Sequence, residues 1–222
     1  MKLFRWRIMS KREKRVLLLD FNFDYPYLAR ELIEEGEHPT VDDVFPLLTE
    51  SLEENKKILK EYIVETLVDG VDLLKGTNFA GMVNHLSPDQ IQYTIDAAKD
   101  SYEYVVAVIA PTMNNLATIY SLINADKLVL VLRQNHTNYG HLPMTIKLIR
   151  QYYTKSEQIR LVYNYDSAFS EVDVNELLEN SFLPIRAVTT LVYDEKSVDD
   201  RDSMTETGLF QLKPLTAKAI SK

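Results

Sequence analysis

The sequence contains no cysteine, only six glycines in 222 residues, and no apolar run of the length that spans a bilayer, which is about 20 residues. Without cysteine there is no disulfide, no thiolate nucleophile and no cysteine-ligated zinc or iron–sulfur site. The glycines form neither G-x-x-x-x-G-K-[ST] nor G-x-G-x-x-G, so these residues lack a glycine-rich phosphate loop. The serine pattern G-x-S-x-G is also absent, which leaves serine hydrolase chemistry without support.

Histidine is scarce and has no metal-binding pattern. His136 and His141 are five residues apart, whereas a helical zinc pair needs a spacing of four. No acidic ligand stands close to them in the sequence. We therefore expect no metal site and no catalytic residue of these classes.

The charge is distributed unevenly. The net charge is −8, but the first 15 residues hold seven bases and one acid, so the rest of the chain is strongly acidic. An acidic body argues against nucleic-acid binding through the domain itself. A hydrophobic content of 45% is that of a globular protein. We predict a basic arm over 1–15 and one α/β domain over 16–222.

Short apolar runs alternate with amphipathic stretches. The predicted strands cover 16–19, 104–109, 128–132 and 159–163. Most are apolar on both faces, which is typical of a mostly parallel sheet between two layers of helices. Helices are predicted over 26–35, from Ser87 onwards, and over 114–124, 140–153 and 171–180. A hairpin formed by 62–68 and 71–74, closed by a type I′ turn at Asp69-Gly70, makes the sheet mixed.

Polar residues follow the first predicted strand. Asp20 and Asn22 stand where open α/β sheets bind ligands, and a carboxylate there can hold a water or a hydrated magnesium ion. The alternative is that they only turn the chain and cap the next helix. The strand over 104–109 is followed by no carboxylate, and Asn114 or Asn115 is expected to cap a helix.

Several segments have the order of motifs found in one family. They are 15–22 (RVLLLDFN) with 39–44 (PTVDDV), 71–76 (VDLLKG), 102–106 (YEYVV), 125–131 (ADKLVLV) and 161–166 (LVYNYD). In this order they resemble the MinD/ParA ATPases of the deviant Walker A, or SIMIBI, class, nearest the CpaE/TadZ pilus-assembly branch. The resemblance covers about residues 14–200 and implies a P-loop NTPase-like fold.

The sequence also departs from this family. The family's first strand and its lysine-containing phosphate loop would precede the matched region, and the first 15 residues do not accommodate them. Asn22 stands at the second switch aspartate and Val108 at the Walker B aspartate. The resemblance therefore leaves Asp20, Asn22 and Asn164 as vestigial nucleotide-binding residues, Asn164 at the adenine. It implies no catalytic residue and no metal ligand.

Two functions are compatible with these departures. The first is a degenerate relative, a pseudo-ATPase that acts as a positioning or interaction subunit of a pilus, secretion, conjugation or partition system. The second is the C-terminal portion of an active ATPase whose P-loop lies upstream of residue 1. Val108 favours the first and the missing first strand favours the second. We expect no cofactor, with ATP and magnesium bound only if a P-loop is supplied.

The basic arm leaves three hypotheses open. Phe4, Trp6 and the arginines Arg5 and Arg7 suit a peripheral contact with an anionic membrane. A flexible basic tail and a packed edge strand are the alternatives. The expected partners are proteins of a bacterial assembly or partition machine, with a homodimer left open. The expected location is the cytoplasm, including the inner face of the membrane.

Overall fold

A computed structural model describes residues 15–79, 85–113, 115–133, 136–155, 158–166, 186–192 and 212–213. The chain divides into two compact units, Leu3–Asn124 and Ala125–Lys222. A single domain over 16–222 stays a prediction. All of the predicted arm except Arg15 lies outside the described residues.

The first unit contains a four-stranded sheet in the order β2-β3-β1-β4. Its strands are β1 (Val16–Phe21), β2 (Val64–Glu65), β3 (Val71–Leu74) and β4 (Tyr104–Ile109). β1 pairs in parallel with β3 and β4, while β2 pairs antiparallel with β3. The sheet is therefore mixed, as predicted, and every residue of β1 is buried in it.

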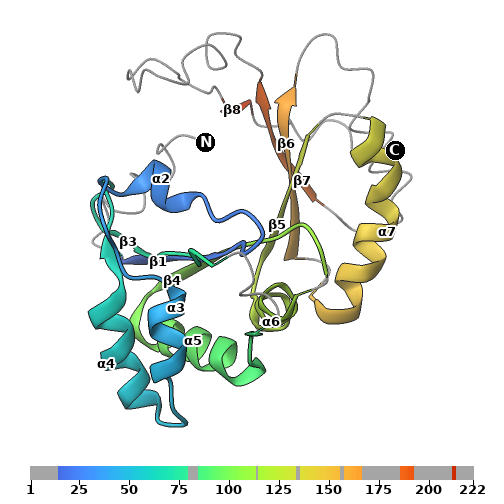
Figure 1. Cartoon of the computed structure of the whole chain (residues 1–222). Helices are drawn as coiled ribbons and strands as arrows, with labels where there is room; N and C mark the ends of the chain where they lie inside the picture. Colours follow the sequence, from blue (N-terminus) through green and yellow to red (C-terminus); the bar gives the residue numbers. More distant parts are fainter. Residues whose placement is uncertain are drawn as a thin grey trace. The chain divides into compact units, whose positions relative to one another are not determined.

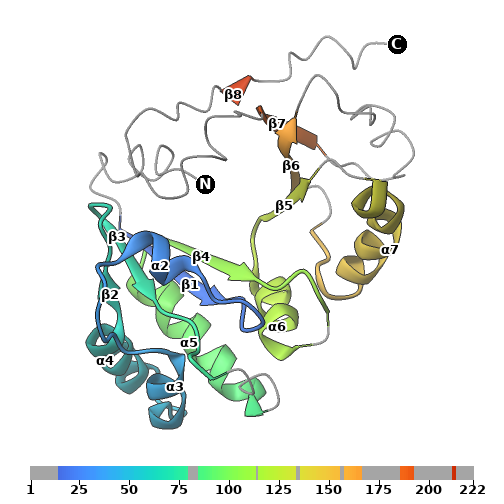
Figure 2. The same ribbon diagram turned by 45° about the horizontal axis from the view of Figure 1, so that its top comes forward.

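Helices cover both faces of this sheet (Figures 1 and 2), which confirms the predicted three-layer α/β fold class. One face carries α3 (Val41–Val44), the 3₁₀ helix η1 (Phe45–Leu47), α4 (Leu52–Tyr62), α5 (Pro88–Ser101) and α6 (Leu116–Asn124). The opposite face carries α2 (Leu28–Leu32).

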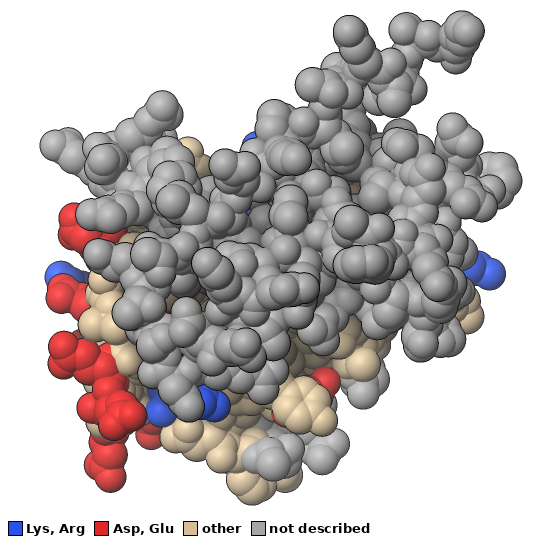
Figure 3. Space-filling model, turned by 90° about the horizontal axis from the view of Figure 1, so that it is seen from above, with Lys and Arg blue, Asp and Glu red and all other residues tan. Residues whose placement is uncertain are grey.

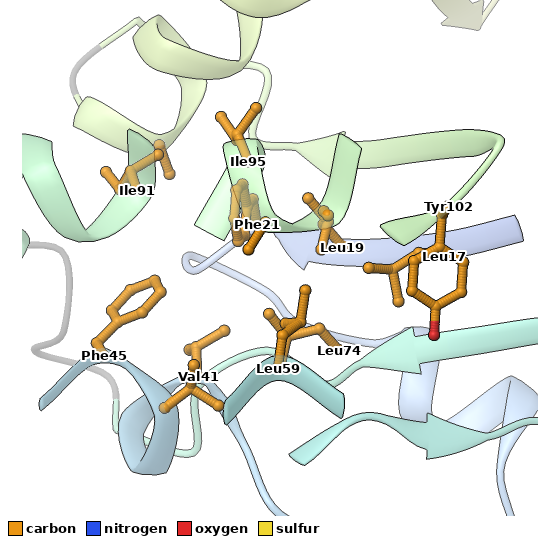
Figure 4. Packing of buried hydrophobic residues seen from close by; sticks show 14 of the residues in the cluster. Leu17, Leu19, Phe21, Val41, Phe45, Leu59, Leu74, Ile91, Ile95 and Tyr102 are labelled. Carbon is orange, nitrogen blue, oxygen red and sulfur yellow. The ribbon is translucent and has the colours of Figure 1, made fainter. Parts of the chain in front are cut away.

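Alternate side chains of β1 enter two separate apolar clusters. Leu17, Leu19 and Phe21 pack with α4 and α5 (Figure 4), whereas Val16 and Leu18 pack with α2. This follows from the two-residue period of a strand. Asp20 continues the second set, so its carboxyl group lies on the α2 face of the sheet.

A polar cluster fixes the opposite, amino-terminal edge of the sheet. The guanidinium of Arg15 donates to Asp72 Oδ2 at 2.9 Å, and the hydroxyl of Tyr102 donates to the same oxygen at 2.7 Å. Burial raises the pKa of Tyr102, so the phenol stays a donor. The cluster joins the starts of β1 and β4 to β3.

The start of α5 confirms its prediction. Pro88 is its first residue, and the N–H of Ser87 donates to Oε1 of Gln90 at 3.1 Å, as a capping box requires. The predicted inward residues Ile91, Ile95 and Ala98 are buried. Local capping and helical periodicity agree here, so the sequence alone located this helix.

Three local predictions need correction. The hairpin is present, but its loop runs over 66–70, because β2 ends at Glu65 and the hydroxyl of Thr66 donates to the carbonyl of Val71 at 2.7 Å. It is therefore not a two-residue type I′ turn, although Gly70 does have a positive φ of 75°. The helix predicted over 26–35 is reduced to α2. α4 was not predicted, because its few apolar residues are interrupted by charged ones.

The second unit contains another four-stranded sheet, in the order β5-β6-β7-β8. Its elements are β5 (Leu128–Arg133), α7 (His136–Tyr152), β6 (Ile159–Asp166), β7 (Arg186–Val192) and β8 (Leu212–Lys213). All pairs are parallel except the last. Both predicted strands are confirmed, α7 begins four residues early, and the helix predicted over 171–180 lies outside the described residues. β5 differs from expectation, because Val129 and Val131 are half exposed.

Among the helices that the structure describes, none combines the length and the apolar character needed to cross a bilayer.

Candidate functional site

Loops from three strands meet at the carboxyl edge of the first sheet. The loop after β1 lies against the loop after β3, since a Cβ on Gly76 would come within 2.7 Å of Pro26 Cβ. It also meets the loop after β4, where the hydroxyl of Thr112 donates to Asp24 Oδ2 at 3.3 Å. Open α/β sheets bind ligands at such an edge, and both Asp20 and Asn22 lie here.

Asp20 is fully buried at this edge. Its Oδ2 accepts a hydrogen bond of 3.1 Å from the N–H of Leu28, the first residue of α2. The carboxyl group therefore performs the capping role that the sequence left open as an alternative to ligand binding. A five-residue helix needs this anchor, because it is too short to be stable by propensity alone.

Gly76 encloses the carboxyl group from the side of β3. A Cβ at this position would lie 2.9 Å from the carbonyl oxygen of Asp20 and 3.2 Å from its Cγ. These distances leave no room for a side chain. Gly76 therefore lies directly against the carboxyl group of Asp20 on the side of β3.

Burial raises the pKa of Asp20 from its ordinary 3.8 to about 6. The backbone N–H groups of Leu28, Asn22 and Tyr27 act in the opposite direction, because they stabilise the charged form. Desolvation is the larger effect. Asp20 thus ionises about two pH units higher than an exposed aspartate.

Two buried oxygen atoms at this edge, Oδ1 of Asp20 and Oδ1 of Asn22, have no hydrogen-bond partner within the part of the chain that the structure describes. Such orphaned acceptors invite a comparison with a magnesium site, which needs near-octahedral oxygen ligands and several waters. Among the described residues, no group of three acidic or histidine side chains converges to hold a metal. The N–H of Leu28 occupies one carboxylate oxygen of Asp20, and Gly76 approaches its Cγ from the side of β3. The described residues at this edge do not by themselves complete a magnesium site.

The neighbouring strand supplies no carboxylate. Val108 stands beside Asp20 in the register of β1 and β4, at the position that resembles the Walker B aspartate. Its side chain packs on the apolar cluster of the α2 face. A carboxylate at this position would be buried among apolar groups without a partner, which is costly.

The other predicted residues have separate positions. Asn164 lies in β6 of the second unit, paired with Arg133 and Leu191. A nucleotide site that includes both Asp20 and Asn164 stays a prediction. Asn115 is confirmed as a cap, since its Oδ1 accepts from the N–H of Thr118 at 2.8 Å. Asn114 lies outside the described residues.

Sequence reasoning missed a contact that shapes this edge. Asp42, at the start of α3, accepts hydrogen bonds from the hydroxyl of Thr77 at 2.7 Å and from the N–H of Asn78 at 3.0 Å. The contact ties α3 to the loop after β3. The signal that could have found it is the pattern Thr40-Val41-Asp42-Asp43, a capping threonine followed by acidic residues, which is typical of a first helical turn.

Exposed aromatic side chains surround the same edge. Tyr25 is 79% exposed and Tyr27 46% exposed in the loop after β1, and Phe79 is 56% exposed after β3. Hollows in the described surface lie elsewhere, one beside Arg15, Lys56 and Tyr102 at the opposite edge of the sheet. The carboxyl edge therefore presents aromatic surface around a closed carboxyl group.

A search of protein-family models and of curated proteins finds no match to the sequence. Solved structures do match the fold. A ParA family ATPase from Chlorobium tepidum TLS has a TM-score of 0.69 and 16% identity, covering 87% of this chain and 79% of that one. The septum site-determining protein MinD from Pyrococcus horikoshii OT3, complexed with Mg-ADP, has a TM-score of 0.62 and 13% identity over 85% of this chain and 73% of its own.

A plasmid partition protein from Borrelia burgdorferi matches with a TM-score of 0.56 and 13% identity, over 86% of this chain and 84% of that one. These likenesses show a fold of the ParA/MinD type. At such identities they show the fold alone.

Proposed function

We propose that the chain is a degenerate member of the ParA/MinD family that binds a protein partner and does not hydrolyse ATP. In this proposal it is a positioning or interaction subunit of a pilus, secretion, conjugation or partition system, on the cytoplasmic side of the membrane. The single observation that carries the proposal is the pair formed by Asp20 and Val108. Asp20 is a buried residue that caps α2, and Val108 is an apolar residue at the position that resembles the Walker B aspartate.

Phosphoryl transfer depends on positioned charge. Lysine and magnesium neutralise the charge that develops on the phosphate, and carboxylates hold the ion. Among the described residues of this edge, the one fully buried carboxyl group is that of Asp20, and it already accepts a hydrogen bond from the start of α2. The described residues around it therefore offer little transition-state stabilisation.

A binding role is supported by the aromatic surface at the same edge. Tyrosine and phenylalanine are enriched in the buried centres of protein interfaces. Tyr25 and Phe79 stand on adjoining loops, and hydrogen bonds of Asp24 and Asp42 connect these loops to neighbouring segments. An aromatic edge of this kind is a suitable docking surface for a protein.

The first test measures ATP turnover and binding with the full chain in magnesium buffer, by phosphate release and by calorimetry with a slowly hydrolysed ATP analogue. We expect no phosphate above the buffer rate and no saturable heat. Turnover with micromolar affinity that is lost in Asp20→Asn would overturn the proposal. Turnover that is equal in wild type and Asp20→Asn identifies a contaminating ATPase. Activity that appears only with upstream sequence fused supports the alternative of an active ATPase.

The second test concerns the partner. Affinity capture with wild type is compared with the double variant Tyr25→Ser and Phe79→Ser, with Leu52→Ser as the matched control at a 40% exposed position on α4. We expect the double variant to lose proteins that wild type and the control retain. Equal retention by all three excludes the aromatic edge as the docking surface.

A further inference from the structure

A hollow of about 210 Å³ lies at the edge of the first sheet where the strands begin. Four of the residues that line it are bases, namely Arg15, Lys56, Lys57 and Lys60, and one is an acid, Glu53. We call this site the basic hollow. The chain as a whole carries a net charge of −8, so this concentration of bases contrasts with the body around it. The carboxyl edge of the sheet is at the other end of the strands.

The basic hollow is built from three segments of the chain. Glu53 and the three lysines follow the spacing i, i+3, i+4 and i+7 along α4, so their side chains share one face of this helix. Ser101 ends α5, which lies beside α4 (Figures 1 and 2), and Arg15 directly precedes β1. Charged and polar groups from separate elements therefore converge here, which distinguishes the hollow from a solvated helix face.

Two of the four bases already have acidic partners. Nη2 of Arg15 donates to Oδ2 of Asp72 at 2.9 Å, which leaves the other N–H groups of the guanidinium out of this bond. Nζ of Lys56 lies 3.1 Å from Oε1 of Glu53 and 2.6 Å from Oδ2 of Asp100. The second of these ion pairs joins α4 to α5 at one wall of the hollow.

The other two bases have no such partner. In the part of the chain that the structure describes, neither Lys57 nor Lys60 forms an ion pair, and both residues are exposed. The four bases meet the three acids named above, which leaves an excess of one positive charge. Lys60 also offsets the partial negative charge at the end of α4. The excess is therefore small and matches a monoanion better than a dianion.

The floor of the basic hollow is apolar. Leu59 is 1% exposed and Tyr102 is 8% exposed, and Ile63 is partly buried. The ring of Tyr102 also supports the guanidinium of Arg15, whose central carbon lies 4.8 Å from the ring centre. Pockets for drug-sized ligands hold about 300–1,000 Å³. A hollow of about 210 Å³ therefore suits a smaller molecule.

We propose that the basic hollow binds a small organic carboxylate. The apolar body of this ligand rests on Leu59, Ile63 and the ring of Tyr102. Its carboxylate group accepts hydrogen bonds from the ammonium groups of Lys57 and Lys60. Charge-assisted hydrogen bonds of this kind are stronger than neutral ones, and the burial of the apolar body adds to the affinity.

A soluble ligand fits this site better than a membrane does. Sites on a membrane surface present exposed apolar anchors beside their bases. None of the residues that line the basic hollow is among the large hydrophobic side chains that the described part of the chain exposes. The inference goes beyond the proposed function, because the hollow shares no residue with the carboxyl edge.

The test titrates the isotope-labelled full chain with benzoate at constant ionic strength and follows the amide NMR signals. Benzamide is the neutral control of the same shape, and acetate is the anion without a ring. We expect benzoate to bind with a Kd on the order of 1 mM and to shift the amide signals of α4, Ser101 and Tyr102. Both controls should bind at least about tenfold more weakly.

Two pairs of substitutions locate the site. Lys57→Gln combined with Lys60→Gln removes both unpaired charges and keeps good helix formers on α4, and the affinity for benzoate should fall at least about tenfold. The matched control combines Lys127→Gln with Lys147→Gln, two exposed lysines of the second unit, and should keep the wild-type affinity. As a second measurement, about 20 mM benzoate should raise the melting temperature of wild type by about 4 to 7 °C, and that of the first variant by less than half as much.

Each of four results would overturn the proposal. Equal shifts with benzoate and benzamide would mean that the hollow does not recognise charge. An unchanged affinity in the variant that lacks Lys57 and Lys60 would place benzoate elsewhere on the chain. Phenyl phosphate that binds more than about tenfold more tightly than benzoate would identify a phosphate site. Absent shifts would exclude a carboxylate site, and sedimentation on anionic vesicles that needs both lysines would then assign the hollow to a membrane.

Discussion

Asp20 shows how one residue type at one position supports two opposite interpretations. At the end of a strand it resembles a ligand-binding carboxylate, and it is also a residue that caps a following helix. Its burial, its bond to Leu28 and the approach of Gly76 make it a structural carboxyl group. The raised pKa of Asp20 follows from this burial, because burial removes water from the charged form of the carboxyl group.

The pKa of Asp20 predicts a pH dependence of stability. The folded chain holds this proton more tightly than the unfolded chain does, so the contribution is fully present below pH 3.8 and is lost as the pH rises through about 6. Between about pH 4.5 and about pH 7.5 the free energy of unfolding should fall by about 2 kcal/mol more in wild type than in Asp20→Asn. Urea denaturation at each pH measures it. Parallel pH profiles of the two proteins would contradict the prediction.

Gly76 predicts a steric effect. Gly76→Ala places a methyl group 2.7 Å from Pro26 and 2.9 Å from the Asp20 carbonyl, so the free energy of unfolding should fall by about 1 to 3 kcal/mol. Gly36→Ala is the matched control, because its methyl group would meet only His38 at 3.4 Å. Thermal denaturation compares the two. Equal melting temperatures would mean that the loops after β1 and β3 separate easily.

At the scale of elements, α4 depends on a contact with the loop before it. Asn55 is 1% exposed, its Oδ1 accepts from the N–H of Thr49 at 2.9 Å, and its Nδ2 donates to the carbonyl of Thr49 at 2.8 Å. The side chain thus holds both backbone groups of one loop residue. This polar clamp, together with buried Leu59, orients the helix on the sheet.

Asn55→Ala removes both bonds and leaves the backbone groups of Thr49 unpaired. We expect the free energy of unfolding to fall by about 2 kcal/mol, as urea denaturation would measure. Lys57→Ala, on the exposed side of the same helix, should change it by less than about 0.5 kcal/mol. Similar losses in both variants would indicate that helix propensity, and not the clamp, is affected.

At the scale of the whole molecule, charge is the dominant surface feature. Figure 3 shows Asp and Glu side chains gathered along one side of the described surface, at the left of the view. Exposed glutamates lie in α2 and in the segment between α2 and α3, namely Glu31, Glu34, Glu35 and Glu37. An acidic surface of this kind repels the phosphate backbones of nucleic acids.

The charge distribution predicts weak binding to DNA. In about 150 mM salt, fluorescence anisotropy with a random duplex should give a Kd weaker than about 100 μM, because the body repels the phosphates. Any binding at lower salt should disappear when Lys11, Arg12 and Lys14 are replaced by serine. Binding that survives this replacement would locate a nucleic-acid surface on the acidic body and contradict the prediction.

Sequence and structure agree most where local chemistry is sufficient. The strands β1 and β4 were predicted because residues 16–19 and 104–109 form short apolar runs, and α5 because its cap and its periodicity coincide. α4 was missed because its few apolar residues are interrupted by charges, and its position depends on the clamp to Thr49. The loop over 66–70 was mispredicted because the Thr66 hydroxyl, and not the Asp69-Gly70 pair alone, closes it.

The sequence by itself determined the mixed α/β sheet, the lack of the two glycine-rich phosphate-loop patterns, and the apolar residue Val108 at the position that resembles the Walker B aspartate. These depend on residue types and on short spacings. Only the tertiary structure decided that Asp20 is a closed cap, because Gly76, Pro26 and Leu28 enclose it from segments that the sequence does not show to be adjacent. It also decided the order β2-β3-β1-β4 of the first sheet, since strand order depends on which strands pair and not on their composition.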